Sequence, residues 1–163
     1  MPRVVELSLA SRGITCTAEL LDEGAPRTCN AIWDALPLEG PLFHTKSSGN
    51  EVYTLLPPFA SENLPLENGS IVPLPGDLLY FTYPRGVFPP TDVRWIDVGT
   101  ASSVACIASF YNRNSVHWME LGFFPGTRWA RITTNLEAWQ AACQDVWLSG
   151  CAGERLLIRQ AIS

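Results

Sequence analysis

The chain contains little charge, and it lacks the segments that target or anchor a protein. Charged residues make up 17% of its 163 residues, and acidic ones outnumber basic ones, giving a net charge of -5. Such a chain repels phosphate backbones and anionic lipid headgroups, so we expect no nucleic-acid and no membrane partner. The sequence has no basic start followed by an apolar run, and no run reaches the roughly 18 apolar residues of a membrane span. We therefore expect a cytoplasmic protein.

Recognisable catalytic and cofactor motifs are also missing. The two histidines, His44 and His117, belong to no HxH or HExxH spacing, so we expect no metal site. The sequence contains neither a GxSxG elbow nor a phosphate-binding loop. The five cysteines have no CxxC spacing, which favours reduced and buried thiols. No cofactor is expected, and whether the protein is an enzyme stays open.

What the chain does contain is a series of strand patterns. In segment 13–20, Ile14, Cys16, Ala18 and Leu20 alternate with polar residues, which predicts a strand with one wet face. Segments 77–83 and 104–111 are apolar at consecutive positions, which predicts strands that are buried on both faces. We expect further strands at 4–9, 42–47, 51–56, 93–98, 128–133 and 155–159.

Two helices are predicted among these strands. In the first, near 27–36, the apolar residues Cys29, Ile32, Trp33 and Leu36 fall at the spacing of one helical face. The second, near 135–148, follows Thr134-Asn-Leu-Glu137, which we interpret as a capping box. Many strands with two helices and no internal repeat predict a mainly β closed barrel with helices over its ends. The length predicts one domain spanning 1–163.

A ligand site is expected near the irregular segments. Segments 57–76 and 84–91 are rich in proline and show no periodicity, and long loops of this kind tend to carry function. Aromatic residues stand beside cationic or polar ones, a combination that small-molecule pockets use, although surface cation–π packing explains it equally well. Glu67-Asn68 could form the rim of a cleft beneath 57–76 or a plain turn. The candidate ligand-binding residues are His44, Glu51, Glu67, Asn68, Arg94, His117, Trp118, Arg128 and Trp129.

The order of these motifs resembles a known family. Helix 28–36 followed by Leu42-Phe43-His44 is similar to the first helix and following strand of cyclophilins. Together with four other motifs, it resembles the small bacterial cyclophilin-like proteins grouped as domain of unknown function 3830. These motifs are Ala-Leu-Pro-Leu at 35–38, 44–49, Glu67-Asn68 and Gly-Asp-Leu-Leu-Tyr at 76–80. The resemblance covers about residues 13 to 150 and implies a closed eight-stranded antiparallel barrel capped by two helices.

The resemblance also bears on activity. In cyclophilins an arginine after Phe-His donates a hydrogen bond to the prolyl nitrogen, whereas this chain has Thr45 there. The family's later Gly-Asn-His element would fall near 126–129, where this chain reads Gly-Thr-Arg-Trp. Prolyl isomerisation would then need a donor from elsewhere, such as Arg94 or Arg128.

Three functional classes therefore remain. The first is a barrel that binds a small polar metabolite, with hydrolase or lyase chemistry not visible in motifs. The second is a peptidyl-prolyl isomerase or a module that binds proline-containing peptides. The third is a subunit of a metabolic enzyme system with a structural role. A homo-oligomer is compatible with each class, and we favour the small-molecule ligand or the enzyme subunit over the isomerase.

Overall fold

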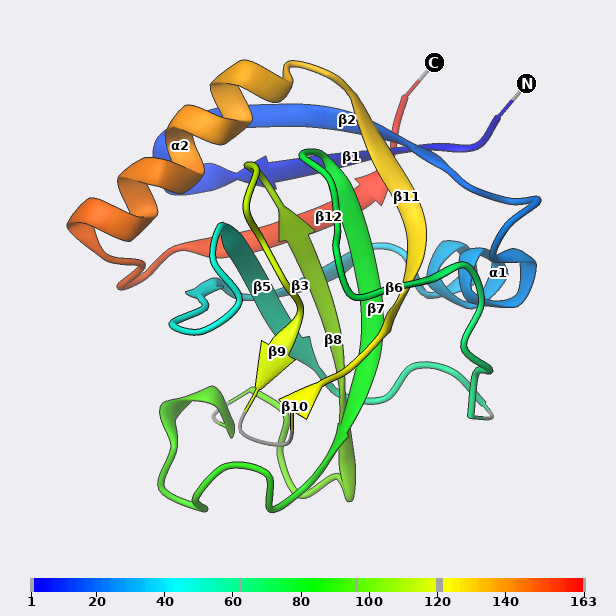
Figure 1. Cartoon of the computed structure of the whole chain (residues 1–163), viewed down its shortest axis with the longest axis vertical. Helices are drawn as coiled ribbons and strands as arrows, with labels where there is room; N and C mark the ends of the chain where they lie inside the picture. The colour runs from blue at the N-terminus through cyan, green and yellow to red at the C-terminus, as the bar shows by residue number, and fades with distance from the viewer. Residues whose placement is uncertain (1, 62, 96, 120–121, 163) are drawn as a thin grey trace.

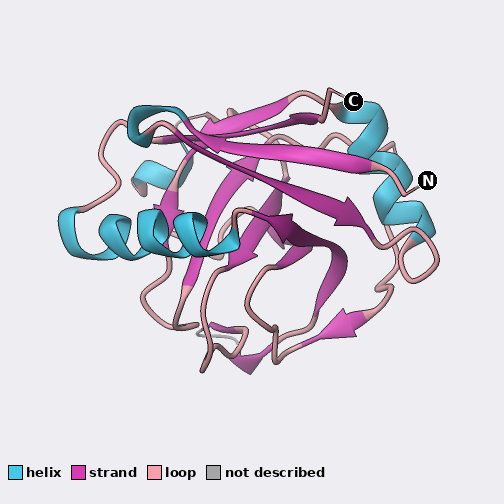
Figure 2. Ribbon diagram, turned by 90° about the horizontal axis from the view of Figure 1, so that it is seen from above, coloured by secondary structure: helices cyan, strands magenta, loops and turns pink. Residues whose placement is uncertain are grey.

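The computed structural model describes residues 2–61, 63–95, 97–119 and 122–162, which form a mainly β protein with two α-helices (Figures 1 and 2). The helices are α1 (Pro26–Ala35) and α2 (Leu136–Ser149). The strands are β1 (Val4–Leu9), β2 (Ile14–Leu20), β3 (Leu38–Pro41), β4 (Phe43–His44), β5 (Glu51–Leu56), β6 (Gly69–Ser70), β7 (Asp77–Pro84), β8 (Ser103–Phe110), β9 (Trp118–Met119), β10 (Gly122–Phe123), β11 (Gly126–Thr134) and β12 (Arg155–Gln160). In the described part of the chain, no helix has the length and apolarity to cross a membrane.

The main sheet is antiparallel and curls into a nearly closed barrel. Its strand order is β3-β12-β1-β2-β11-β7-β8-β5-β4, with β6 paired to β11 outside this path. β3 and β4 lie at opposite ends of the order, yet only Leu42 separates them in the chain. Segment 38–44 therefore brings the two ends of the sheet together. Counted as one strand, β3 and β4 give the eight-stranded antiparallel barrel that the sequence predicted.

Gly40 permits the close packing of β3 against β5 at this closure. A Cβ atom at Gly40 would lie 2.3 Å from the Thr54 hydroxyl oxygen and 3.3 Å from the backbone oxygen of Leu55. Real Cβ atoms essentially never approach another atom within 3.0 Å, so a larger residue would displace the Thr54 side chain or strand β5. The absence of a side chain at Gly40 thus contributes to the closure of the barrel.

Two hydrophobic clusters lie on opposite faces of β7 and β8. Leu78 and Tyr80 belong to the first cluster, which fills the barrel and receives apolar residues from both helices. Leu79 and Phe81 belong to the second, which lies on the other face of the strands. The prediction that these strands are buried on both faces is therefore confirmed.

The loop 85–102, between β7 and β8, covers the second cluster. It contributes the buried side chains of Phe88, Trp95 and Val98. The indole nitrogen of Trp95 donates a hydrogen bond to the backbone oxygen of Pro89 at 2.9 Å, which holds the loop against itself. Figure 1 shows this loop at the end of β7 and β8 that lies farthest from α2. The loop forms one wall of the cleft described below.

The predicted strand at 93–98 is wrong. Residues Val93–Trp95 form a 3-10 turn instead, and Pro89-Pro90 precede it. The Asp92 carboxylate accepts a hydrogen bond from the backbone N–H of Arg94 at 2.9 Å, which stabilises a turn rather than a strand. Trp95 and Val98 of this segment belong to the second cluster, whereas Val93 is exposed.

The predicted capping box at the start of α2 is also wrong, although the helix itself is confirmed. The Thr134 hydroxyl lies 2.7 Å from the Thr17 hydroxyl of β2 and does not cap the helix. Asn135 occupies the N-cap position with φ 58 and makes no side-chain cap hydrogen bond. Its amide instead donates to the backbone oxygen of Thr15. The side chains of Thr134 and Asn135 therefore bond to β2 and not to the first turn of α2.

Candidate functional site

A cleft of about 440 Å³ opens where segment 43–48 and β5 face the loop 85–102. Segment 43–48 includes β4 and the start of the turn into β5, and Phe43 and His44 pair with Tyr53 and Val52 of β5. The loop is held in place by the second hydrophobic cluster. The cleft is lined by Phe43, His44, Thr45, Lys46, Ser47, Ser48, Glu51, Tyr53, Tyr83, Phe88, Asp92, Val93, Arg94, Trp118 and Cys151.

Glu51 is the buried acidic group of this cleft. It is the first residue of β5 and is 3% exposed. Its backbone oxygen accepts a hydrogen bond from the Thr45 N–H at 3.0 Å, which fixes the turn around it. Burial raises the pKa of the Glu51 carboxyl from 4.5 to about 8, while the Ser48 and Thr45 hydroxyls favour the charged form and limit the rise. The carboxyl is therefore mainly protonated at neutral pH, and it can donate or accept a proton near that pH.

Arg94 faces Glu51's strand from the loop side. Its Nε and Nη2 atoms donate to the two Asp92 oxygens at 2.8 and 2.6 Å, forming a bidentate ion pair. Its Nη1 atom lies 3.4 Å from the Tyr53 hydroxyl, and its guanidinium carbon lies 3.4 Å from the centre of the Phe88 ring. The hydrogen bonds to Asp92 raise the pKa of Arg94. One edge of the guanidinium is thus committed to Asp92.

His44 lies between two clefts. Its Nδ1 atom is 2.7 Å from the Thr45 backbone oxygen, and its Nε2 atom is 2.8 Å from the Tyr111 hydroxyl. A carbonyl oxygen only accepts, so Nδ1 carries the hydrogen and Nε2 accepts from Tyr111. Burial lowers the pKa of His44, which favours this neutral form. On its other side lies a smaller cleft of about 280 Å³, whose lining includes Gln144 and Trp147.

Glu67 and Asn68 have structural contacts away from the larger cleft. The Glu67 carboxylate accepts hydrogen bonds from the backbone N–H and the hydroxyl of Thr28, both at 2.8 Å, and from the Arg27 N–H at 3.2 Å. These donors belong to the first turn of α1, whose own N-cap residue, Ala25, supplies no side-chain hydrogen bond. Glu67 therefore caps α1 from a distant part of the chain. The Asn68 amide donates to the Arg128 backbone oxygen at 2.9 Å.

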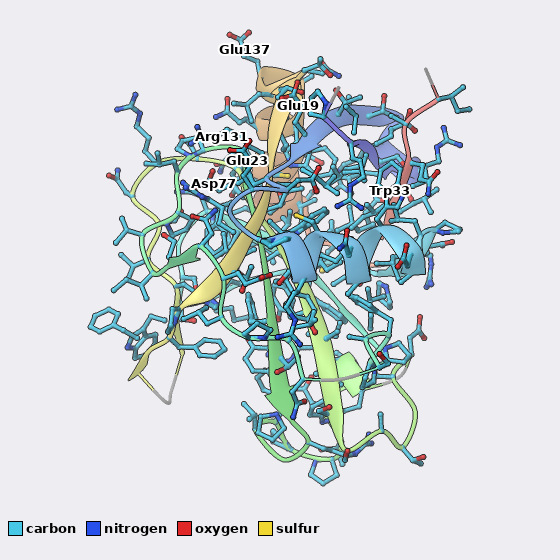
Figure 3. The ribbon with its side chains drawn as sticks, turned by 90° about the vertical axis from the view of Figure 1, so that its right-hand side faces the viewer. Glu19, Glu23, Trp33, Asp77, Arg131 and Glu137 are labelled. Carbon is cyan, nitrogen blue, oxygen red and sulfur yellow. The ribbon has the colours of Figure 1, made fainter. Side chains whose placement is uncertain are left out.

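Arg128 and Trp129 also lie outside this cleft. The Arg128 guanidinium is 3.6 Å from the buried carboxylate of Asp77. Arg131 of β11 approaches the same carboxylate at 3.1 Å (Figure 3). Trp129 is fully buried in the first hydrophobic cluster, where it cannot form a cleft wall. The structure thus does not gather the predicted residues into one cleft beneath 57–76, because Trp129 packs in the core and Arg128 faces Asp77.

His117 is buried, but it packs against aromatic rings. Its ring centre lies 4.2 Å from that of Phe81, 4.9 Å from that of Phe124 and 6.0 Å from that of Phe110. Burial lowers its pKa to about 4, so it is neutral at physiological pH. Its neighbour Trp118 is 40% exposed and lines the larger cleft. Four predicted residues therefore meet there: His44, Glu51, Arg94 and Trp118.

Several cleft residues were not predicted. Tyr83 and Phe88 were placed in a strand and an irregular segment, and Asp92 had no signal other than its position two residues before Arg94. Their role depends on the path of the loop 85–102, which local periodicity does not encode. The proline-rich character of 84–91 is the available signal, and it indicates the loop that lines this cleft but not which of its residues do so.

The described residues also bear on metal and thiol chemistry. In the part of the chain that the structure describes, no group of three His, Cys, Asp or Glu side chains is arranged to hold a metal ion. All five cysteines are free thiols, and four of them are buried. Cys151, which is half-buried, lines the larger cleft.

The fold and the cleft define a small antiparallel barrel with an aromatic, partly polar cavity at one wall. The chain matches the family described as "Protein of unknown function (DUF3830)" over residues 7–158. Because this match covers most of the chain, the protein belongs to that family. Among curated proteins, none matches the chain.

The likeness to one solved structure supports the fold. The chain is similar to McbB, solved in complex with tryptophan, with 16% sequence identity and a TM-score of 0.65. The alignment covers 98% of this chain and 46% of McbB, so this chain spans about half the length of that protein. A hypothetical protein from Archaeoglobus fulgidus, solved in solution, gives 21% identity and a TM-score of 0.44 over 98% of this chain and 95% of its own. At such identities the likeness to McbB demonstrates the fold alone.

Proposed function

We propose that the protein binds a small polar metabolite with an apolar or aromatic part in the cleft between segment 43–48, β5 and the loop 85–102. The observation that carries this proposal is the meeting of His44, Glu51, Arg94 and Trp118 at one cleft of about 440 Å³. They come from four different parts of the chain. A volume of this size lies in the range of roughly 300–1,000 Å³ that is typical of small-molecule pockets.

The chemistry of the lining supports the proposal. Aromatic rings of Phe43, Tyr53, Tyr83, Phe88 and Trp118 line the cleft and provide apolar contact area. Glu51 and Arg94 add a carboxyl and a guanidinium beside these rings, and such directed groups usually orient a ligand. McbB, a protein of similar fold, was solved with tryptophan, which also combines an aromatic ring with polar groups.

A binding screen with two tryptophan variants tests the proposal. Trp118 lines the larger cleft and is 40% exposed, whereas Trp147 lines the smaller cleft and is 54% exposed. Ligands are first selected by their increase of Tm from a panel of amino acids, amines, carboxylates and amides, with tryptophan included. Calorimetry then compares the affinities of the wild type, Trp118→Ala and Trp147→Ala.

We expect Trp118→Ala to weaken a selected ligand about tenfold or more, since loss of an aromatic contact in a cleft typically costs over 1 kcal/mol. Trp147→Ala is expected to leave the affinity unchanged. The proposal fails if no compound raises Tm. It also fails if Trp147→Ala weakens every ligand while Trp118→Ala weakens none, because the binding site would then be the smaller cleft.

Prolyl isomerisation is a second candidate because Arg94 brings a guanidinium into the same cleft as Phe43 and His44. Nε and Nη2 donate to Asp92, however, and Nη1 lies 3.4 Å from the Tyr53 hydroxyl, so the guanidinium is already engaged by protein groups. We therefore expect no fast isomerisation in a protease-coupled peptide assay. Fast turnover that Arg94→Ala abolishes would establish isomerase activity with a donor from the loop.

A further inference from the structure

Glu51 is a buried carboxyl that forms no ion pair with a described side chain of this protein. Glu51 is 3% exposed, and the hydroxyls of Ser48 and Thr45 form hydrogen bonds with its carboxyl group. No ion pair involving Glu51 occurs among the described residues. A buried carboxylate is normally paired with a cation or protonated, because an isolated charge loses its hydration. Glu51 is therefore held as the neutral acid at neutral pH, and no cationic side chain among the described residues is paired with it.

The cations that line the cleft do not supply this partner. Arg94 holds Asp92 through two nitrogens, so its charge is already balanced. Lys46 is exposed and takes part in no ion pair within the described residues. Burial lowers the pKa of His44 and outweighs the hydrogen bond to the Thr45 carbonyl, which raises it, so the ring is neutral at neutral pH. Of the two charged side chains, Arg94 is therefore paired within the loop and Lys46 is exposed to solvent, so neither forms an ion pair with Glu51.

The other titratable groups that interact with Glu51 are neutral. They are Tyr53 on β5, Tyr83 on β7 and Cys106 on β8. Burial raises the pKa of each of these groups, so none carries a charge at neutral pH. A positive charge beside Glu51 would have to come from a bound molecule.

Aromatic rings make the cleft suitable for such a molecule. The rings of Phe43 and Tyr53 lie 5.6 Å apart, and those of Tyr83 and Phe88 also lie 5.6 Å apart. Ring faces attract cations and contact alkyl or aryl groups favourably. Phe88 already contacts the Arg94 guanidinium in this way.

We propose that the cleft selects a small organic amine, whose ammonium group forms an ion pair with the Glu51 carboxylate and whose apolar part packs against the aromatic rings. This inference rests on the proposed binding function and names its ligand class. On binding, the O–H bond of the protonated Glu51 carboxyl breaks and its proton passes to solvent. The ammonium group keeps its own protons, so the complex contains one new pair of opposite charges.

This exchange couples binding to pH in a definite direction. If the amine binds the ionised carboxyl alone, the apparent Kd is the intrinsic Kd divided by the ionised fraction of Glu51. With a pKa of about 8, affinity should rise about tenfold per pH unit below that value and level off above it. At about pH 7, roughly nine-tenths of a proton should be released per ligand bound. A neutral ligand that accepts a hydrogen bond from the protonated carboxyl would show the opposite dependence.

Calorimetry with three matched probes tests the inference. Phenylethylamine, phenylpropionate and phenylethanol share a phenyl ring and carry an ammonium, a carboxylate and a hydroxyl group, respectively. Each is titrated at several pH values from about 6 to 8, a range in which an alkylammonium stays protonated. Titrations in two buffers of different ionisation enthalpy give the number of protons released. We expect phenylethylamine to bind most tightly, with the pH dependence and proton release given above.

Two variants test whether Glu51 causes the proton release and the pH dependence of amine binding. Glu51→Gln should abolish proton release and the pH dependence, and it should weaken phenylethylamine about tenfold or more at pH 8. Lys46→Gln should preserve the pH dependence, which distinguishes Glu51 from the exposed cation at the same cleft. Circular dichroism checks the fold of each variant, and proton release by the wild type tests the inference without any substitution.

The outcomes separate the ligand class from the binding function. Preferential binding of phenylpropionate or phenylethanol, or amine binding without proton release, would overturn the inference while leaving a ligand-binding cleft. Failure of all three probes would also overturn it if other compounds of the panel bind in a Trp118-dependent manner. If no compound of either set binds, the proposed function itself fails.

Discussion

Replacement of Glu51 by glutamine should stabilise the folded protein at neutral pH, although it removes the ionisable group of the cleft. The folded structure keeps the Glu51 carboxyl buried, which raises its pKa from 4.5 to about 8. The unfolded chain exposes the same carboxyl to water and ionises it at the ordinary value. Glutamine does not titrate, and its amide can bond to the hydroxyls of Ser48 and Thr45. The variant therefore avoids a cost that the wild type bears above pH 4.5.

The sign and size follow from proton linkage. Between 4.5 and about 8 the folded state binds more protons at Glu51 than the unfolded state does, so wild-type stability falls as pH rises through this window. Each pH unit in the window corresponds to about 1.4 kcal/mol. From below the window to about pH 7, the free energy of unfolding of Glu51→Gln minus that of the wild type should grow by ~3 kcal/mol.

Urea unfolding at a series of pH values measures this difference. Glu19→Gln is a matched control, because Glu19 lies exposed on β2 (Figure 3). For this control we expect a difference within about 0.5 kcal/mol at all pH values. The reasoning would be refuted if the Glu51→Gln difference stayed constant with pH, since the folded carboxyl would then titrate like a solvated one.

Three further predictions concern the fold. Glu67→Ala removes the cap of α1 and should lower the free energy of unfolding, measured in urea, by ~1–2 kcal/mol. The hydrogen bonds of the cap lower the pKa of Glu67, so this stabilisation should disappear as the pH falls through the lowered pKa. A loss no larger than that of the control Glu23→Ala, at an exposed position, would contradict the cap. Gly40→Ala should cost ~1–3 kcal/mol by overpacking, and Thr54→Ala should recover part of this loss in a double-mutant cycle; additivity would argue against the contact. Trp139→Ala should lower the free energy of unfolding by ~3–5 kcal/mol, because this indole is fully buried and donates to Ser109 at 3.0 Å. Trp33→Ala should lower it less, because Trp33 is half-buried. Equal losses in urea unfolding would contradict this prediction.

The sequence by itself determined the elements whose signals are local. The alternation from Ile14 to Leu20 marks β2 because successive side chains of a strand point to opposite faces. The consecutive apolar residues of β7 and β8 marked strands that have a hydrophobic cluster on each face. The order of these elements also led to the correct family and barrel, which the match over residues 7–158 supports.

Tertiary structure decided the identity of the cleft. Glu51 and Arg94 belong to a strand and a loop that meet only because the second hydrophobic cluster holds the loop 85–102 in place. Glu67 and Asn68 have the composition of a turn, and their sequence does not reveal that Glu67 caps α1 near Thr28. Burial, hydrogen bonding and charge pairing depend on residues that are distant in sequence. These non-local contacts give Glu51 a raised pKa in a cleft and Glu67 a lowered one at a helix end.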